Sequence, residues 1–220
     1  MAAHKDTDLA TCPHCGHEQT VTVWAIVNGD INTRTKSKII NGSFFDYVCK
    51  HCGETFTVLY PTLYEDDTNH IMIYCANTPM QESIAIQTVL QRRDSVKEEE
   101  DYRIRVTSAP EKWREKVSLA AHGFDDRLVE IMKVALLEKL NNDGSLGNVE
   151  DVMCWYDKED ANFELEIFGD RHCLVGVRGD FYKYIKDKCE STLNRKEPNP
   201  IIVDIPWAID FLEDNHFRCI

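Results

Sequence analysis

Polar and apolar side chains alternate over several short stretches in the first third of the chain. The stretch at residues 18–28 is rich in β-branched residues, which favours a strand. Asn28-Gly29-Asp30 is typical of a turn, and the polar stretch at residues 32–38 predicts a loop. Three more strands are predicted, at residues 44–48, 54–60 and 70–76. Together these strands predict a small antiparallel sheet.

A period of three to four residues replaces the alternation in the middle of the chain. Helices are predicted around residues 80–95, 110–121 and 125–140. The third has the clearest pattern, because apolar residues recur on one face from Leu128 to Leu140. The charge run at residues 97–101 predicts a solvated connection, and residues 102–107 predict a short strand.

Alternation returns after residue 150 and predicts three short strands, which we expect to form a meander. They are expected at residues 152–156, 163–168 and 173–177. A C-terminal helix is predicted after Gly179-Asp180, followed by a short amphipathic segment near Trp207 to Leu212. The aromatic residues of this tail are more typical of a core than of a ligand-binding surface.

Four of the nine cysteines form two C-x-x-C pairs. The pairs are Cys12-Pro13-His14-Cys15 and Cys49-Lys50-His51-Cys52, and a glycine follows each. Two intervening residues let both thiolates of a pair reach one ion, and the glycine permits the positive φ that turns backbone N–H groups toward sulfur. Redox pairs are the alternative, but no βαβ pattern of the thioredoxin type surrounds them.

Four thiolates close a tetrahedral shell and leave no position for a reacting water, so the site is predicted to be structural. We expect one Zn²⁺ held by Cys12, Cys15, Cys49 and Cys52, with iron as the second choice for four thiolates. The fold class is therefore predicted to be α+β, with an N-terminal zinc-ribbon-like antiparallel module and an α+β body. Domains are expected at residues 1–100 and 101–220.

The 220-residue chain has a formal net charge of −13, and nearly all of it lies after residue 60. An acidic body repels phosphate backbones, which disfavours nucleic acid as a partner except at the nearly neutral N-terminal module. No apolar run approaches the roughly 20 residues of a membrane span, and the N-terminus lacks a signal-peptide pattern. We therefore expect a cytoplasmic protein, and the scattered unpaired cysteines agree with a reducing compartment.

The cysteine motifs resemble those of the CpXC family. The resemblance continues through Tyr60-Pro61-Thr62-Leu63-Tyr64-Glu65-Asp66 and the apolar stretch Ile71-Met72-Ile73-Tyr74, and it extends to about residue 140. Lys50 stands where the second motif of the family often has proline. The resemblance implies four metal-binding cysteines and a bacterial or archaeal cytoplasmic setting. It implies no activity, because the family is functionally uncharacterised.

Three functions remain open at the level of sequence. The leading hypothesis is a non-enzymatic zinc-ribbon protein whose acidic tail binds another protein. The first alternative is a nucleic-acid-binding ribbon that uses Arg34, Lys36 and Lys38. The second is a divalent-metal enzyme built on the acidic clusters at residues 65–67 and 125–126, although a turn and a helix N-terminus explain these clusters better. No catalytic signature motif occurs, which favours a protein without enzymatic activity. The oligomeric state and the identity of the partner do not follow from the sequence.

Overall fold

The computed structural model describes residues 3–95, 102–142, 144 and 147–217. The chain forms two compact units, Met1–Val117 and Ser118–Ile220. The boundary between them falls inside helix α3 (Pro110–Ala121). The predicted division into domains at residues 1–100 and 101–220 stays a prediction. The charge run at residues 97–101 lies outside the described residues.

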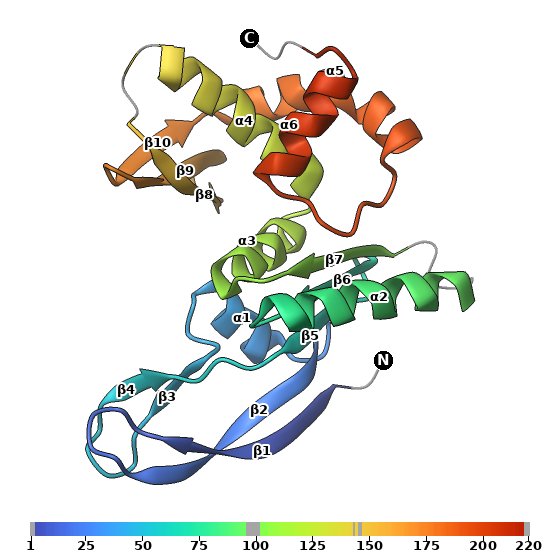
Figure 1. Cartoon of the computed structure of the whole chain (residues 1–220). Helices are drawn as coiled ribbons and strands as arrows, with labels where there is room; N and C mark the ends of the chain where they lie inside the picture. Colours follow the sequence, from blue (N-terminus) through green and yellow to red (C-terminus); the bar gives the residue numbers. More distant parts are fainter. Residues whose placement is uncertain (1–2, 96–101, 143, 145–146, 218–220) are drawn as a thin grey trace. The chain divides into compact units, whose positions relative to one another are not determined.

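The first unit is built on a five-stranded mixed sheet with the order β1-β2-β5-β6-β7 (Figure 1). Its strands are β1 (His4–Thr11), β2 (Glu18–Asn28), β5 (Thr62–Asp66), β6 (Ile71–Cys75) and β7 (Arg103–Thr107). The pairs β1–β2 and β5–β6 are antiparallel, whereas β2–β5 and β6–β7 are parallel. The strand predicted at residues 18–28 is confirmed, and its first half projects beyond β5 as a two-stranded ribbon with β1.

A second, two-stranded antiparallel sheet lies beside this ribbon. It consists of β3 (Asp46–Val48) and β4 (Thr55–Thr57). A small apolar cluster joins it to β1 and β2, and its buried members are Ala10, Cys12, Val21, Cys49 and Phe56. Two antiparallel hairpins packed on so few apolar side chains have a marginal core, and two of the four paired cysteines belong to it.

Helices α1 (Thr33–Ile40), α2 (Pro79–Ser95) and the part of α3 up to Val117 complete the first unit. The prediction of a loop at residues 32–38 is wrong, because α1 occupies this segment. Arginine and lysine are good helix formers, and the helix buries Ile39. Helix α2 lies along one face of the sheet, over Leu63 and Met72 (Figure 1). The indole N–H of Trp113 in α3 donates to the Ile73 carbonyl at 2.9 Å.

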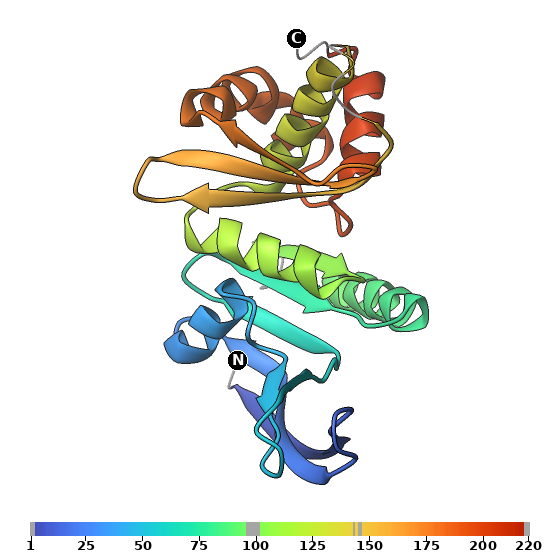
Figure 2. The same ribbon diagram turned by 90° about the vertical axis from the view of Figure 1, so that its left-hand side faces the viewer.

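The second unit places three helices on one side of a three-stranded antiparallel meander (Figure 2). Its elements are α4 (Asp126–Asn142), β8 (Val149–Asp157), β9 (Asn162–Gly169), β10 (Cys173–Val177), α5 (Gly179–Lys196) and α6 (Ile205–Asp214). Leu165 on the sheet, Met132 on α4 and Ile185 on α5 are fully buried in one core. The predicted meander and C-terminal helix are confirmed.

The whole chain is α+β, as predicted, and the N-terminal hairpins form a zinc-ribbon-like module. Three differences from the sequence-based predictions concern strands of the first unit. The predicted strands do not form one antiparallel sheet, because β2 and β6 lie in a mixed five-stranded sheet while β3 and β4 form a separate pair. No element was predicted for β1, whose polar residues are almost all exposed. Glu65 and Asp66 do not lie in a turn, because both belong to β5 and are fully buried.

Candidate metal centre

Both C-x-x-C pairs lie at the tips of antiparallel hairpins. Cys12 directly follows β1, and Cys15 lies three residues before β2 begins. Cys49 directly follows β3, and Cys52 lies three residues before β4 begins. The two hairpins therefore present equivalent turns to each other, and Figure 1 shows their tips side by side.

The four sulfur atoms form one compact cluster in which every pair lies within 4.8 Å. The Cys12 and Cys52 sulfurs are 3.8 Å apart, and the Cys15 and Cys49 sulfurs are 3.6 Å apart. These separations exceed the roughly 2.05 Å of a disulfide bond. They match the edge of a tetrahedron, about 3.8 Å, that follows from metal–sulfur bonds of about 2.3 Å. The arrangement therefore fits a single four-coordinate ion.

The backbone forms the same turn in both knuckles, the C-x-x-C-Gly segments at residues 12–16 and 49–53. The Gly16 N–H donates to the Cys12 carbonyl at 2.9 Å, and the Gly53 N–H donates to the Cys49 carbonyl at 3.0 Å. Gly16 and Gly53 have φ values of +73° and +79°, which side chains with a Cβ rarely adopt. The glycines thus permit the turn that places each pair of sulfurs on one side of the backbone.

Gln19 links the two hairpins through its side-chain amide. Its Nε2 donates to the Val48 carbonyl at 3.1 Å, and its Oε1 accepts from the Lys50 N–H at 2.8 Å. Gln19 is itself buried, so both bonds are shielded from water. This link fixes the second knuckle against β2 from outside the ligand set.

The ionisation of the sulfurs depends on backbone donors and on crowding. Backbone N–H groups of Cys52 and His51 lower the pKa of the Cys49 thiol to about 6. The backbone N–H of His17 favours the Cys15 thiolate, but loss of solvent and the three neighbouring sulfurs raise the pKa of Cys15 to about 12. Four thiolates at this distance repel one another, so a cation is needed to ionise them all.

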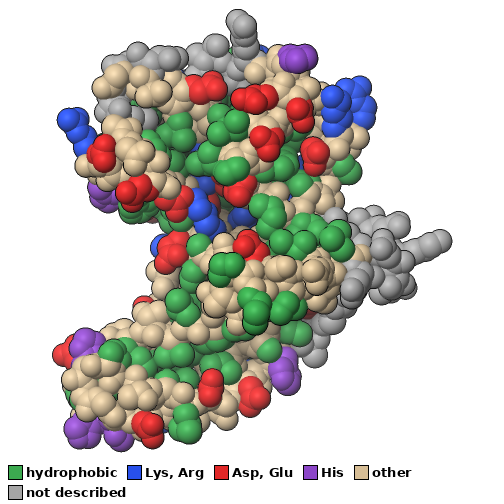
Figure 3. All heavy atoms as spheres, viewed as in Figure 1, with side chains coloured by type: hydrophobic (Ala, Val, Ile, Leu, Met, Phe, Trp, Pro, Cys, Tyr) green, Lys and Arg blue, Asp and Glu red, His purple; other side chains and the backbone are tan. Residues whose placement is uncertain are grey.

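The cluster is shielded on one side only. Cys12 and Cys49 are buried, whereas Cys15 and Cys52 are exposed. The histidines at this end are exposed as well, and the rings of His17 and His51 stack at 5.3 Å. Figure 3 shows histidine side chains gathered at this tip. An ion here would sit at the surface, within reach of chelators.

Within the described residues, these cysteines are the one group of three or more potential ligands that comes together. The two C-x-x-C motifs predict the same four residues, and the structure brings them within bonding reach of one ion. The donor set fits Zn²⁺ and also fits iron, so the geometry supports metal binding without assigning the metal.

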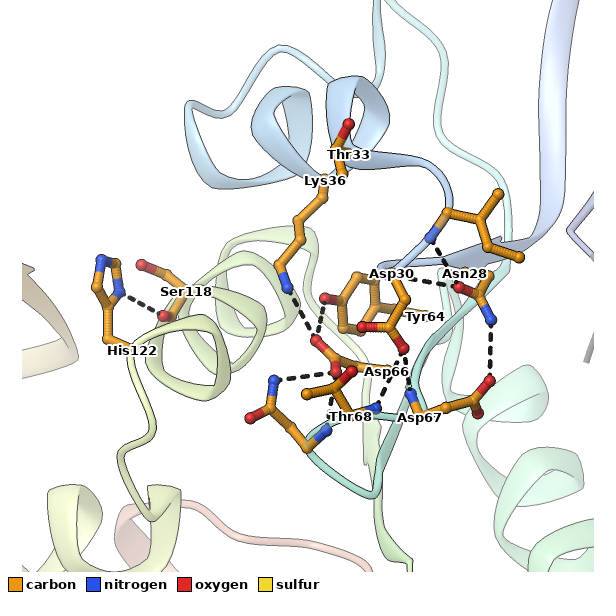
Figure 4. Close-up of polar contacts among 12 residues, drawn as sticks. Asn28, Asp30, Thr33, Lys36, Tyr64, Asp66, Asp67, Thr68, Ser118 and His122 are labelled. Atoms are coloured by element: carbon orange, nitrogen blue, oxygen red, sulfur yellow. Dashed lines mark hydrogen bonds and ion pairs between the residues drawn. The ribbon is translucent and has the colours of Figure 1, made fainter.

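Two residues of the acidic cluster at residues 65–67, Asp66 and Asp67, are engaged in protein contacts (Figure 4). Asp66 accepts four hydrogen bonds, from Lys36 at 2.8 Å and from Tyr64, the Asn69 N–H and the Asn69 amide at 2.9 Å each. Burial alone would raise the pKa of Asp66, but these donors outweigh it and hold that pKa below its usual range. With both carboxylate oxygens occupied, Asp66 is a structural anchor.

The neighbours of Asp66 form the same kind of polar scaffold (Figure 4). Asp30 accepts from the backbone N–H groups of Asp67 and Thr68 at 2.9 and 3.1 Å. The Asn28 side chain donates to Asp67 at 3.3 Å. Gly29 lies so close to the Tyr64 hydroxyl that a Cβ would clash with it. This part of the chain packs α1 and the turn after β5 onto the sheet.

The second acidic cluster has a structural role in the second unit. Asp125 lies directly before α4 and forms a two-pronged ion pair with Arg127, whose shortest distance is 2.6 Å. Arg127 also donates to the carbonyls of Glu197 and Pro198. Asp126 begins α4, where the helix dipole favours an acid, as the sequence analysis expected.

The three basic residues proposed for nucleic-acid binding have different surroundings. Lys36 is paired with Asp66 and faces the polar scaffold. Arg34 and Lys38 lie on the other side of α1, where they line a groove with Lys50. The sequence could not reveal this separation, because it depends on α1 being a helix. The sequence did not indicate that Lys50 and Gln19 line the same groove as Arg34 and Lys38.

Comparisons with known proteins agree with the cysteine geometry. No helix in the described part of the chain has the length and apolar character of a membrane span. No curated protein and no solved structure matches the chain. The family model of the CpXC protein matches residues 10–133, which include both cysteine pairs, β5 and the start of α4. Since this match covers more than half of the chain, the protein belongs to the CpXC family.

Proposed function

We propose that the chain is a non-enzymatic, cytoplasmic zinc protein whose N-terminal hairpins are held together by one structural Zn²⁺. The observation that carries this proposal is the cluster of four sulfurs at tetrahedral spacing. Four cysteine ligands leave no open position on the ion, so hydrolysis by a metal-bound water has no place at this centre.

Zinc is preferred to iron because a purely structural role needs a metal without redox chemistry. The core between the hairpins is marginal, and structural zinc typically contributes an apparent binding free energy of roughly 10–16 kcal/mol, which would stabilise it. Spectroscopy of the protein purified without a tag distinguishes the metals. A colourless protein that takes up Co²⁺ with the intense bands of tetrahedral thiolate coordination supports zinc. A coloured protein with the charge-transfer bands of ferric thiolate contradicts it.

We further propose that the second unit binds another protein as an extended peptide added to the edge of β10. In the described part of the chain, β10 pairs with β9 on one side only. Next to this edge lies an open groove of about 630 Å³ between α4 and α5, lined by Leu136, Val177, Phe181 and Tyr184. A strand added at β10 would place alternate side chains in this groove and beside Leu174.

The exposure of the apolar residues supports this surface. Leu174 is 60% exposed and Tyr184 is 41% exposed, and the Lys188 ammonium lies 4.5 Å from the centre of the Tyr184 ring. Lys139 and Arg178 flank the same groove, although Arg178 pairs with Asp180. The peptide that fits is therefore apolar at the alternate positions that enter the groove.

Site-specific photo-crosslinking in cells tests the peptide proposal. A benzoylphenylalanine probe is placed at position 174 or 184, and a control probe is placed at Ile209, which is 40% exposed elsewhere on the unit. The proposal expects one protein crosslinked from both test positions and not from the control. The purified binding segment of that protein should bind the Tyr184→Ala variant at least tenfold more weakly than the wild-type chain. It should bind the Ile209→Ala variant with unchanged affinity. No common crosslinked protein, or unchanged affinity with Tyr184→Ala, contradicts the proposal.

A further inference from the structure

A groove of about 450 Å³ lies in the first unit between β2, α1 and β3. Its floor is the part of β2 that extends beyond β5, from Gln19 to Trp24. One wall is α1, with Arg34, Thr35 and Lys38. The other wall is β3 and the residue after Cys49, including Asp46, Tyr47, Val48 and Lys50. All these residues belong to the ribbon module.

The charge of this groove differs from that of the rest of the molecule. Arg34, Lys38 and Lys50 line it, and Asp46 is the one acidic residue among the lining residues. The chain as a whole has a formal net charge of −13. Within the described residues, none of these three cationic side chains has an ion pair or a side-chain hydrogen bond, whereas Lys36 is neutralised by Asp66.

Without a bound anion, the spacing of the cations on α1 is electrostatically unfavourable. Arg34 and Lys38 are four residues apart, so they lie on the same face of the helix. Like charges at this spacing destabilise a helix. Lys50 comes from the opposite wall of the groove, which adds a third positive charge facing the same space. The groove therefore has the electrostatic character of an anion site.

Aromatic side chains lie within the same groove. Trp24 and Tyr47 both line it and are partly exposed. Tyr47 is held in place because its hydroxyl donates to the Thr22 carbonyl. The ammonium of Lys5 lies 6.0 Å from the centre of the Trp24 ring and adds positive charge at this end. Cations that follow a groove, together with partly exposed aromatic rings, are the combination that binds phosphates and stacks bases.

We propose that this groove binds a phosphate-bearing ligand with a nucleobase, the chemistry shared by single-stranded nucleic acid and free nucleotides. Arg34, Lys38 and Lys50 contact the phosphates, and the exposed part of Trp24 stacks on a base. The site is sequence-tolerant, because phosphate contacts and stacking do not read base identity. This activity is separate from the peptide surface proposed for β10 and does not depend on which metal the cysteines bind.

Fluorescence anisotropy with the metal-loaded full chain tests the proposal. The probes are labelled single-stranded DNA and RNA oligonucleotides at low ionic strength, with a free nucleoside triphosphate and inorganic phosphate as competitors. Binding through three phosphates predicts a slope of about −2 for log K against log salt on single strands. Displacement by the nucleotide at concentrations comparable to those of the oligonucleotide assigns a nucleotide site. Displacement only by other oligonucleotides assigns a single-strand site.

Variants with the same change in net charge distinguish binding in the groove from a general effect of the charge of the protein. Lys38→Glu combined with Lys50→Glu should weaken binding at least tenfold, and Trp24→Leu should weaken it more than Trp24→Phe. The control is Lys158→Glu combined with Lys183→Glu, two exposed lysines of the second unit that change the net charge equally. Circular dichroism and metal content show whether each variant keeps its fold.

The outcomes decide the proposal in either direction. Salt-dependent binding that is lost in the groove variant and kept in the control variant supports it. The proposal is wrong if neither nucleotides nor oligonucleotides bind at low ionic strength. It is also wrong if folded groove and control variants lose affinity equally. Both results leave the metal content of the wild-type chain unaffected, so the structural zinc proposal is judged separately.

Discussion

The buried carboxylate of Asp66 joins α1, β5 and the turn after β5 through four accepted hydrogen bonds. We predict that Asp66→Asn lowers the free energy of unfolding by about 2–4 kcal/mol, because the ammonium of Lys36 loses its counter-charge in a largely buried position. Urea unfolding at neutral pH measures this change. Asp187→Asn, at an exposed position on α5, should change stability by less than about 0.5 kcal/mol.

The pH dependence of the same variant follows from the lowered pKa of Asp66. A carboxyl whose pKa is lower in the folded state adds stability above its unfolded pKa, about 3.9 for aspartate. That stability is lost as the pH falls through the lower folded value. The difference between wild type and Asp66→Asn should therefore be constant above about pH 5 and shrink below about pH 4. A difference that grows on acidification would contradict the assignment.

Helix α6 begins with a side-chain cap in the second unit. The Asp204 carboxylate accepts the Trp207 N–H at 2.9 Å, and Pro206 occupies the first turn. We predict that Asp204→Ala destabilises α6 by about 1 kcal/mol, the usual loss for an N-cap. Hydrogen exchange of the α6 amides measures the effect locally. Asp210→Ala, in the middle of the same helix, should leave the protection of these amides nearly unchanged.

The elements that the sequence predicted well are those whose own side chains bury a regular apolar pattern. Strand β2, helix α4 and the meander of the second unit belong to this group. Strand β1 was missed because lysine and aspartate disfavour strands, and it forms by pairing with β2 along its length. Helix α1 was taken for a loop because most of its residues are polar and its apolar residues, Ile39 and Ile40, lie together at its C-terminal end.

The candidate metal centre was predictable because all four ligands carry a local signal, a C-x-x-C pair followed by glycine. The groove in the first unit was not, since it joins residues from α1, β2 and the second knuckle. Its cations are separated by up to sixteen positions in the sequence, from Arg34 to Lys50. The burial of Glu65 and Asp66 was missed for a related reason, because charged residues rarely lie inside a sheet.

Acidification should release the metal from the whole chain before it unfolds the second unit. Protons compete with the ion for the four sulfurs, so metal affinity falls as the pH falls. A chromogenic zinc indicator, read alongside the fluorescence of the protein, measures the release. If the metal stayed bound until the second unit unfolds, the four-cysteine cluster would not be its binding site.

Native mass spectrometry of the untagged chain, followed by hydrogen exchange, tests the central claim that one metal ion holds the hairpins together. We predict one zinc ion per chain, its loss in Cys49→Ser, and its retention in Cys75→Ser, which changes a buried cysteine outside the cluster. Removing the ion with a chelator should abolish amide protection in β1 to β4. A metal-free chain with these amides fully protected would contradict the claim and make the two cysteine pairs candidates for redox chemistry.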